Sequence, residues 1–339
     1  MTQKWNKPLG ILVGRRPDVR TFQEDPSLPM SNKYIGIEIE AENIQFEMSD
    51  INKNLFYWDI VPDGSLRNFG AEFISKKLRG KDIFLALHEL TACLAISGLT
   101  PEYSDRTSVH IHADARFMTL DQLRSFIIYY LIHEPLLFAY VGHNREENNY
   151  CVPYYLNNRG ISNISTIFKN IEHAHQILDT INRAKKYEAM NIHSIQEKGS
   201  IEFRAHYGTH DPELILKWVR LILSMFKETK TSLYEQHLEH FLSVPYYFIA
   251  NAFIEKHGLS PATNLKECEE KARESVGNLL IHKENVYSLE KEMSLHWPKT
   301  KPEPKASPVS EYVPAIPATM AFDGLNDNPI DEALDEEYP

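Results

Sequence analysis

The stretch GIEIEAE, residues 36–42, alternates apolar and acidic side chains in strict order. Successive side chains of an extended chain point to opposite faces, so the isoleucines share one face and three glutamates share the other: Glu38, Glu40 and Glu42. A half-buried antiparallel strand has this pattern, and its simplest interpretation is a solvated outer face. Three like charges in a row repel one another, whereas exposed strands usually mix in Lys or Thr. The stretch therefore predicts a strand and leaves open whether its acidic face meets solvent or a positive ligand.

Three later stretches repeat the alternation: GAEFIS (70–75), SVHIHAD (108–114) and SIEFRAHYG (200–208). Opposite their apolar residues they carry carboxylates, imidazoles and a guanidinium, with almost no Ser, Thr or Lys. These polar residues are Glu72, His110, His112, Asp114, Glu202, Arg204 and His206. Residues two apart on a strand lie roughly 7 Å apart on one face, which suits side chains that reach separate ions in a shared cavity.

Helices are expected between and after the strands. Apolar residues at helical spacing and capping residues place them at 82–97, from Thr119 onward, near 165–186, at 212–230 and within 264–294. Thr119 with Gln122 forms a capping box, and Asp211 with Pro212 supplies an N-cap and a first-turn proline. Helices between strands would also suit a parallel sheet, but strict alternation favours an antiparallel one. The sequence therefore predicts an α+β fold whose sheet has one polar, functional face.

The composition predicts a soluble globular protein, because 42% of its 339 residues are hydrophobic and 24% are charged. We expect an irregular N-terminal extension (1–32), one catalytic domain with C-terminal helices (33–298) and an acidic, Pro-rich, disordered tail (299–339). The tail holds three Lys and nine Asp or Glu, a net charge of −6 out of −11 for the chain. This acidic balance argues against direct nucleic-acid binding.

The cysteines and the apolar runs indicate a cytoplasmic location. Cys93, Cys151 and Cys268 form no CxxC pair, which favours a reducing compartment without a disulfide framework. The N-terminal residues contain no apolar run typical of a signal peptide. The most apolar stretch, 126–141, is interrupted by His, Glu and Pro and is too short to span a bilayer. No membrane partner is expected, and the oligomeric state stays open.

The polar strand faces predict phosphate chemistry assisted by metal ions. Carboxylate oxygens with an occasional imidazole suit Mg²⁺ or Mn²⁺, and Arg204 and Arg145 would supply planar groups for phosphate oxygens. Zinc is less favoured, since no Cys lies near the pattern and no HExxH is present. Because GxGxxG and GxxxxGK[ST] are also absent, a nucleotide would be bound by side chains and metals.

Each of these residues also has a simpler interpretation. His110 and His112 are about as often structural as ligands, and Glu202 with Arg204 could form an ordinary surface ion pair. Asp63, in PDGS, suits a turn, and Arg145 suits a loop. The functional interpretation depends on finding this pattern in four separate strands. If each residue had only its simpler role, all four strands would have an unusually charged outer face by chance.

The ordered set of motifs resembles the amidoligase family, a branch of the glutamine synthetase-like carboxylate–amine ligases. The motifs are GIEIE, DGSL, GxEFIS, VHIH, NREENNYC, MNIHS and IEFRAHYGT, and they span about residues 34–225. The resemblance implies a glutamine synthetase-like catalytic domain: a curved antiparallel sheet with helices on its convex face and ATP held between metal ions on its concave face.

The resemblance also implies roles for single residues. Glu38, His110 and Glu202 would share one metal ion, and Glu40 would hold a second with Glu72 and the neighbouring Asp63. The nucleotide would be bound by His112, Arg145, Arg204, Tyr150 and Asn191. The expected catalytic residues are Asp63, Arg145 and Arg204, of which Arg204 would face the transferred phosphate or a substrate carboxylate.

The implied activity is ATP-dependent amide formation, which joins a small-molecule or peptide carboxylate to an amine through an acyl phosphate. Three alternatives stay open at this point. The first is a phosphotransferase of the guanidino-kinase kind on the same fold, and the second is a non-catalytic binding or structural member. The third is a metal-dependent hydrolase, which would need no ATP.

Overall fold

The computed structural model describes residues 7–15, 28–29, 32–44, 55–168, 174–260, 262 and 264–282. All of these residues belong to one unit of the chain, Met1–Trp297. The predicted tail at 299–339 lies outside the described residues, as does the end of the helical region expected within 264–294.

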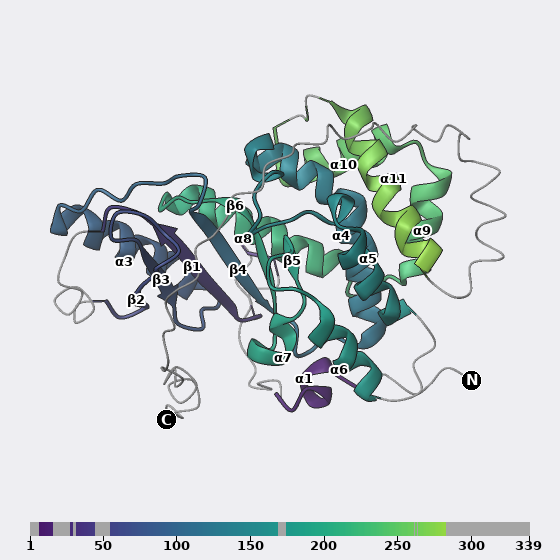
Figure 1. The fold of residues 1–339 in the computed structure, drawn as a ribbon, viewed down its shortest axis with the longest axis horizontal. Helices are drawn as coiled ribbons and strands as arrows, with labels where there is room; N and C mark the ends of the chain where they lie inside the picture. The colour runs from purple at the N-terminus through teal and green to yellow at the C-terminus, as the bar shows by residue number, and fades with distance from the viewer. Residues whose placement is uncertain are drawn as a thin grey trace, which may run out of the picture. The chain divides into compact units, whose positions relative to one another are not determined.

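Six strands form one antiparallel sheet in the order β2-β3-β1-β4-β6-β5 (Figure 1). Their bounds are β1 Ile35–Ala41, β2 Trp58–Pro62, β3 Ala71–Ser75, β4 Ser108–Asp114, β5 Met190–Asn191 and β6 Ser200–Tyr207. The α+β class and the antiparallel sheet predicted from strict alternation are confirmed.

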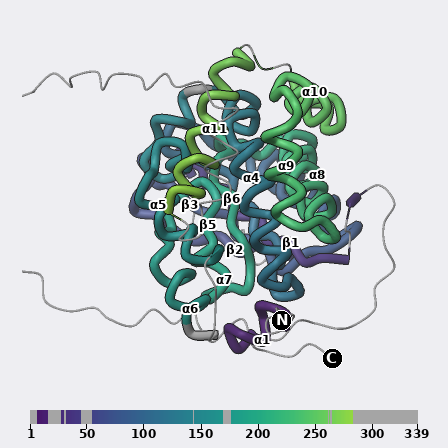
Figure 2. Tube along the Cα trace, turned by 90° about the vertical axis from the view of Figure 1, so that its right-hand side faces the viewer, coloured from purple at the N-terminus to yellow at the C-terminus, as the bar shows by residue number. Residues whose placement is uncertain are grey.

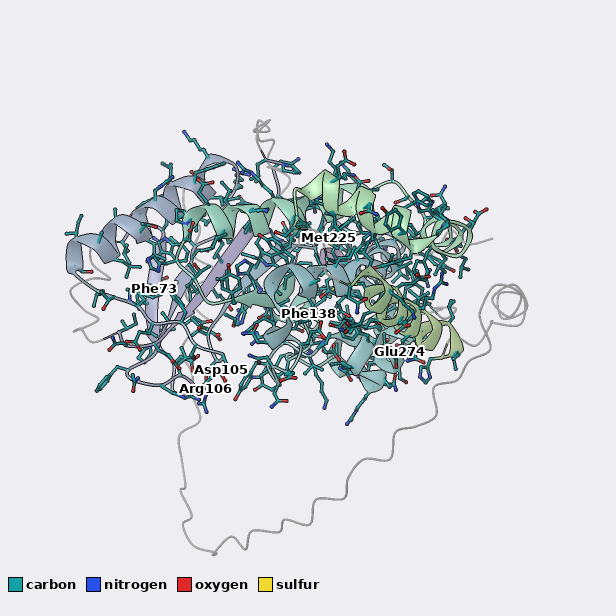
Figure 3. All side chains as sticks on the ribbon, turned by 90° about the horizontal axis from the view of Figure 1, so that it is seen from above. Phe73, Asp105, Arg106, Phe138, Met225 and Glu274 are labelled. Carbon is teal, nitrogen blue, oxygen red and sulfur yellow. The ribbon has the colours of Figure 1, made fainter. Side chains whose placement is uncertain are left out.

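Helices α3 (Lys81–Ser97), α4 (Leu120–Val141) and α8 (Pro212–Glu228) cover the apolar face of the sheet. The ring of Phe126 in α4 lies 5.9 Å from that of Phe203 in β6 and 4.4 Å from that of Phe226 in α8. Figure 3 shows Met225 of α8 on one side of the sheet, and Asp105 and Arg106, in the turn before β4, on the other. The helices therefore leave the polar face to loops and short helical turns.

Helix α4 begins at the predicted capping box, in which Thr119 and Gln122 each accept a backbone N–H of the other. It buries residues on all sides, because α9 (Tyr234–Ser243), α10 (Tyr246–His257) and α11 (Leu265–His282) pack against it away from the sheet (Figures 1 and 2). Within the described ranges, no helix is long and apolar enough to cross a membrane.

Helix α8 begins as predicted, since the Asp211 carboxylate accepts the N–H groups of Glu213 and Leu214. The helix predicted near 165–186 is confirmed by α6, which lies within that range, but the predicted start is displaced. The chain forms α5 (Asn158–Ser165), a 3-10 turn and then α6 (Ala174–Arg183). Helix α5 begins early because the Asn157 side chain caps it by accepting the Gly160 N–H.

Part of the N-terminal extension, expected to be irregular, is a short helix, α1 (Leu9–Leu12). Leu9 is fully buried, and the Leu9 and Gly10 N–H groups donate to the carbonyls of Met118 and Arg116. Figures 1 and 2 place α1 beside α7 (Ser194–Lys198), and Arg15 donates to the Gln196 carbonyl there. This segment packs because its apolar residues dock onto the domain.

Candidate functional site

The strand register brings the polar residues into one row across the sheet. Glu40 lies opposite Glu72 across β1 and β3, and Glu38 lies opposite His110 across β1 and β4. His112 lies opposite Glu202 across β4 and β6, and Glu202 in turn lies opposite Asn191 of β5. Directly opposed residues of antiparallel strands point to the same face, so the row runs from β3 to β5.

This face does not meet bulk solvent. The exposed fractions of Glu38, His110, His112 and Glu202 are 7%, 2%, 6% and 5%. Burying several ionisable side chains is costly unless they are paired or bind an ion. The solvated-face interpretation of GIEIEAE is therefore wrong.

Glu38 lies at the centre of the cluster. Its Oε1 lies 3.0 Å from His112 Nε2 and accepts a hydrogen bond of 2.7 Å from Lys198 Nζ. Its Oε2 lies 3.2 Å from His110 Nδ1. Burial raises the pKa of the Glu38 carboxyl, but His112, His110 and Lys198 together hold it well below its ordinary value.

Glu202 closes the cluster from β6. Its Oε1 lies 3.5 Å from His110 Nδ1 and accepts from Arg204 Nη1, while Asn191 Nδ2 donates to its Oε2 at 2.7 Å. Burial opposes ionisation, yet His112, Arg204 and His110 lower the pKa of the Glu202 carboxyl. Glu202 is thus a charged side chain held in place from three sides.

The pKa of Glu72 is shifted in the opposite direction from the pKa values of Glu38 and Glu202. Burial and the nearby carboxylates of Glu38 and Glu40 raise its pKa to about 9. These carboxylates repel one another in the protein alone, and a divalent cation between them would remove that repulsion.

Two groups of side chains in the described part of the chain have the geometry to hold a metal ion. One contains Glu38, His112 and Glu202, and the other contains Glu38, Glu72 and His110; within each group the ligand atoms lie within 4.8 Å of one another. Glu38 belongs to both groups, so its two oxygens are placed to serve two ions. Carboxylates and imidazoles without thiolates fit Mg²⁺ or Mn²⁺.

This grouping differs from the one that the resemblance implied. His112 belongs to the group of Glu38 and Glu202, whereas the resemblance assigned it to the nucleotide. His110 belongs to the group that contains Glu72. Glu40 is in neither group. Its carboxylate accepts from Ser108 Oγ, which also lies 2.7 Å from His110 Nε2. Ser108 therefore links Glu40 to His110 and orients the imidazole.

His206 does not lie on the polar face, contrary to the alternation in SIEFRAHYG. The register shifts between Val109 and Ile111, so that β6 has one extra residue there and His206 lies opposite the core residue Val109. The His206 ring lies 5.4 Å from that of Trp218 in α8. A β-bulge changes which face the following side chains point to, and alternation cannot reveal it.

Arg145 donates to backbone carbonyls instead of joining the cluster. Arg145 lies in the 3-10 turn His143–Arg145 and is 2% exposed. It donates to the carbonyls of Ala205, Arg204, Asp105 and Thr107 at 3.1–3.3 Å. These bonds join β6 to the turn before β4. A phosphate contact by Arg145 would require some of them to break.

The other predicted residues lie at the edges of the cluster. Asp63 follows β2, accepts the Ser65 N–H at 2.8 Å and lies close enough to raise the pKa of Glu72. Tyr150 accepts from Arg204 Nε at 2.9 Å through its carbonyl, and its ring is 45% exposed. Neither places a side chain among the two ligand groups.

Sequence reasoning missed Lys198, the last residue of α7. Helix α7 has only five residues, which is too short to show helical periodicity in the sequence. A lysine outside the alternating strand pattern does not stand out as a site residue. Ser194, which lies 3.3 Å from His112 Nδ1, was missed for the same reason. Ser200 lies 3.0 Å from the same atom and is in phase with Glu202 in SIEFRAHYG, but the sequence analysis singled out only the ionisable residues of that face.

Comparison with models of known protein families identifies the family of this chain. The family model described as "Putative amidoligase enzyme" matches residues 40–226, which is 187 of the 339 residues. The matched segment includes β3, β4, β5 and β6, and hence all the cluster residues except Glu38. No curated protein matches the chain.

Proposed function

Because the chain belongs to the amidoligase family and is thus a ligase-type enzyme, we propose that it joins a carboxylate to an amine with the hydrolysis energy of ATP. The observation that supports this proposal is the row of carboxylates and imidazoles across four strands, in which Glu38, Glu202, His110 and His112 are buried and Glu72 is half-buried. We further propose that the sheet has the glutamine synthetase-like architecture of that superfamily.

In this proposal Glu38, Glu72, His110, His112 and Glu202 hold two Mg²⁺ or Mn²⁺ ions. When bound, these ions neutralise the charge of the nucleotide phosphates. Asn191 and Ser108 fix the orientation of Glu202 and His110, as the hydrogen-bond partners of metal ligands do.

Arg204 is the proposed ligand of the transferred phosphate. Its Nη1 donates to Glu202 and its Nε to the Tyr150 carbonyl, so the plane of the guanidinium is fixed. Those two bonds leave Nη2 for an anion. A preorganised cation stabilises charge that develops during phosphoryl transfer without reorganising.

The reaction has two balanced steps. A substrate carboxylate oxygen attacks the γ-phosphorus of ATP, the bond to the bridging oxygen breaks, and ADP leaves. The amine then attacks the acyl carbon, and the C–O bond breaks to release phosphate. Asp63, half-buried at the end of β2, is the proposed acceptor of the proton that an incoming ammonium loses.

The test is an ADP-release screen over amino acids, polyamines and short peptides, each tried as carboxylate and as amine. A ligase releases ADP only when both substrates are present, together with one equivalent of amide. ADP release with a single acceptor would instead identify a phosphotransferase. Glu202→Gln, which keeps the Asn191 contact geometry but removes the charge, should abolish turnover in either case.

A further inference from the structure

Lys198 occupies a fixed position above the cluster. It ends α7 and is followed by Gly199, whose φ of 73° lies in the left-handed region. A Cβ on Gly199 would lie 2.7 Å from Arg116 Cγ, so both the conformation and the space require glycine. The tight turn leads directly into β6 and directs Lys198 back over the polar face.

The Lys198 ammonium is the positive group nearest to the shared glutamate. Its Nζ lies 2.7 Å from Glu38 Oε1, the same oxygen that lies 3.0 Å from His112 Nε2. Glu202 and Glu72 add to the attraction: burial lowers the pKa of Lys198, but these three carboxylates raise it overall. The ammonium therefore supplies positive charge where a metal ion would.

A metal ion bound to Glu38 Oε1 would compete with this ammonium, because two cations at the same carboxylate oxygen repel each other. Glu38 belongs to both ligand groups, and its Oε1 is the atom that faces His112 in the first group. The Lys198 side chain is 49% exposed, so it can leave without breaking the packing of the core.

We propose that Lys198 is the counter-cation of the metal-free site, that a divalent ion displaces it from Glu38, and that the freed ammonium then binds nucleotide phosphate. This inference rests on the proposed function for its nucleotide. Its first part, the exchange of cations, depends only on the cluster.

The exchange predicts a gain in metal affinity when the ammonium is removed. Lys198→Met keeps the length of the side chain and removes its charge, and Lys198→Gln is the second variant in case the first does not fold. Lys77→Met, at an exposed lysine after β3, is the matched control. Free Mn²⁺ is measured by electron paramagnetic resonance during titration of each protein.

We expect Mn²⁺ to bind Lys198→Met and Lys198→Gln about tenfold or more tightly than the wild type and Lys77→Met. The gain in melting temperature on adding Mn²⁺ should be correspondingly larger, because tighter binding stabilises the folded state more. Unchanged or weaker Mn²⁺ binding in the folded Lys198 variants would overturn the exchange.

The phosphate contact is tested on the Mn²⁺-saturated proteins with a non-hydrolysable ATP analogue. We expect Lys198→Met to bind the analogue about tenfold more weakly than Lys77→Met does; equal affinity would overturn this part alone. If wild type binds Mn²⁺ and the exchange is observed but no substrate pair yields ADP and amide, the proposed ligase fails and the exchange stands. Absence of Mn²⁺ binding in every protein would overturn both proposals.

Discussion

Two arginines that were expected to act together on phosphate have different surroundings. Arg204 shares the polar face with Glu202, whereas Arg145 is surrounded by backbone carbonyls of β6 and of the turn before β4. Replacing each by lysine gives a matched pair of experiments, because the charge is kept and the planar group is lost in both.

Arg204→Lys should reduce turnover about a hundredfold and leave the melting temperature nearly unchanged. Lysine can still pair with Glu202, but its single ammonium cannot also hold a fixed donor towards an anion as Nη2 does, and removing one preorganised donor costs about that much. The comparison requires the same preparation assayed for ADP release and for thermal unfolding. Wild-type turnover would reduce Arg204 to an ion-pair partner of Glu202.

Arg145→Lys should instead destabilise the fold by about 2 kcal/mol or more, because buried carbonyls lose their donors. Urea unfolding followed by circular dichroism measures the loss. A fully stable Arg145→Lys protein with impaired turnover would contradict the structural role and return Arg145 to the nucleotide site.

Elements with strong local signals were predicted well, and those defined by tertiary contacts were not. The helix at 82–97 and the strand at 200–206 lie within a residue of α3 and β6, and both begin or end at signals in their own sequence. The two-residue strand β5 and the bulge in β6 exist only through pairing with a neighbour. The same distinction applies to the site: alternation revealed Glu38, His110 and Glu202 and also places Ser108 on their face, whereas Lys198 reaches the cluster through a contact that no local pattern records.

Glu134, inside α4, should make the stability of the fold depend on pH. The residue is fully buried and accepts the Tyr154 N–H at 2.8 Å, and burial raises its pKa from 4.5 to about 8. The folded state therefore holds a proton that the unfolded state releases. This contribution to stability is complete below about pH 4.5 and is lost as the pH rises to about 8.

Glu134→Gln, which is uncharged at every pH, should remove that contribution. Urea unfolding at pH 5, 6, 7 and 8 should show that the variant loses less free energy of unfolding than the wild type on going from pH 5 to pH 8. Glu255→Gln, at an exposed residue of α10, is the control and should follow the wild type. If the free energy of unfolding changed equally with pH in all three proteins, Glu134 would not hold a proton in the folded state and this prediction would be wrong.

At the scale of the whole molecule, divalent cations should stabilise the folded chain. An ion that binds only the folded state at one hundred times its Kd adds about 2.7 kcal/mol. Thermal unfolding with and without Mn²⁺ should show a rise of several degrees in wild type and almost none in Glu38→Gln. Glu42→Gln, at the residue that follows β1, keeps the oxygen that accepts the Arg67 N–H and should behave as wild type; an equal response of both variants would argue against the cluster as the binding site.

The acidic C-terminal region, 299–339, lacks the periodicity of a packed element. We expect its deletion to change the free energy of unfolding by less than about 1 kcal/mol, as changes in unpacked surface segments do. Chemical denaturation of the truncated and full-length chains tests this. A large loss would show that the region docks on the domain.

The strand order has a consequence for synthesis on the ribosome. Strand β4 pairs with β1 and β6, but 85 residues (115–199) separate β4 from β6 along the chain. At a translation rate of roughly 5–20 residues per second, β4 waits on the order of 5–20 s with one edge open while the apolar helix α4 emerges. An unpaired edge of this kind invites association between nascent chains. A chain that stalls before residue 200 also lacks Glu202, so the proposed ligand group of Glu38, His112 and Glu202 is completed only after β6 has emerged.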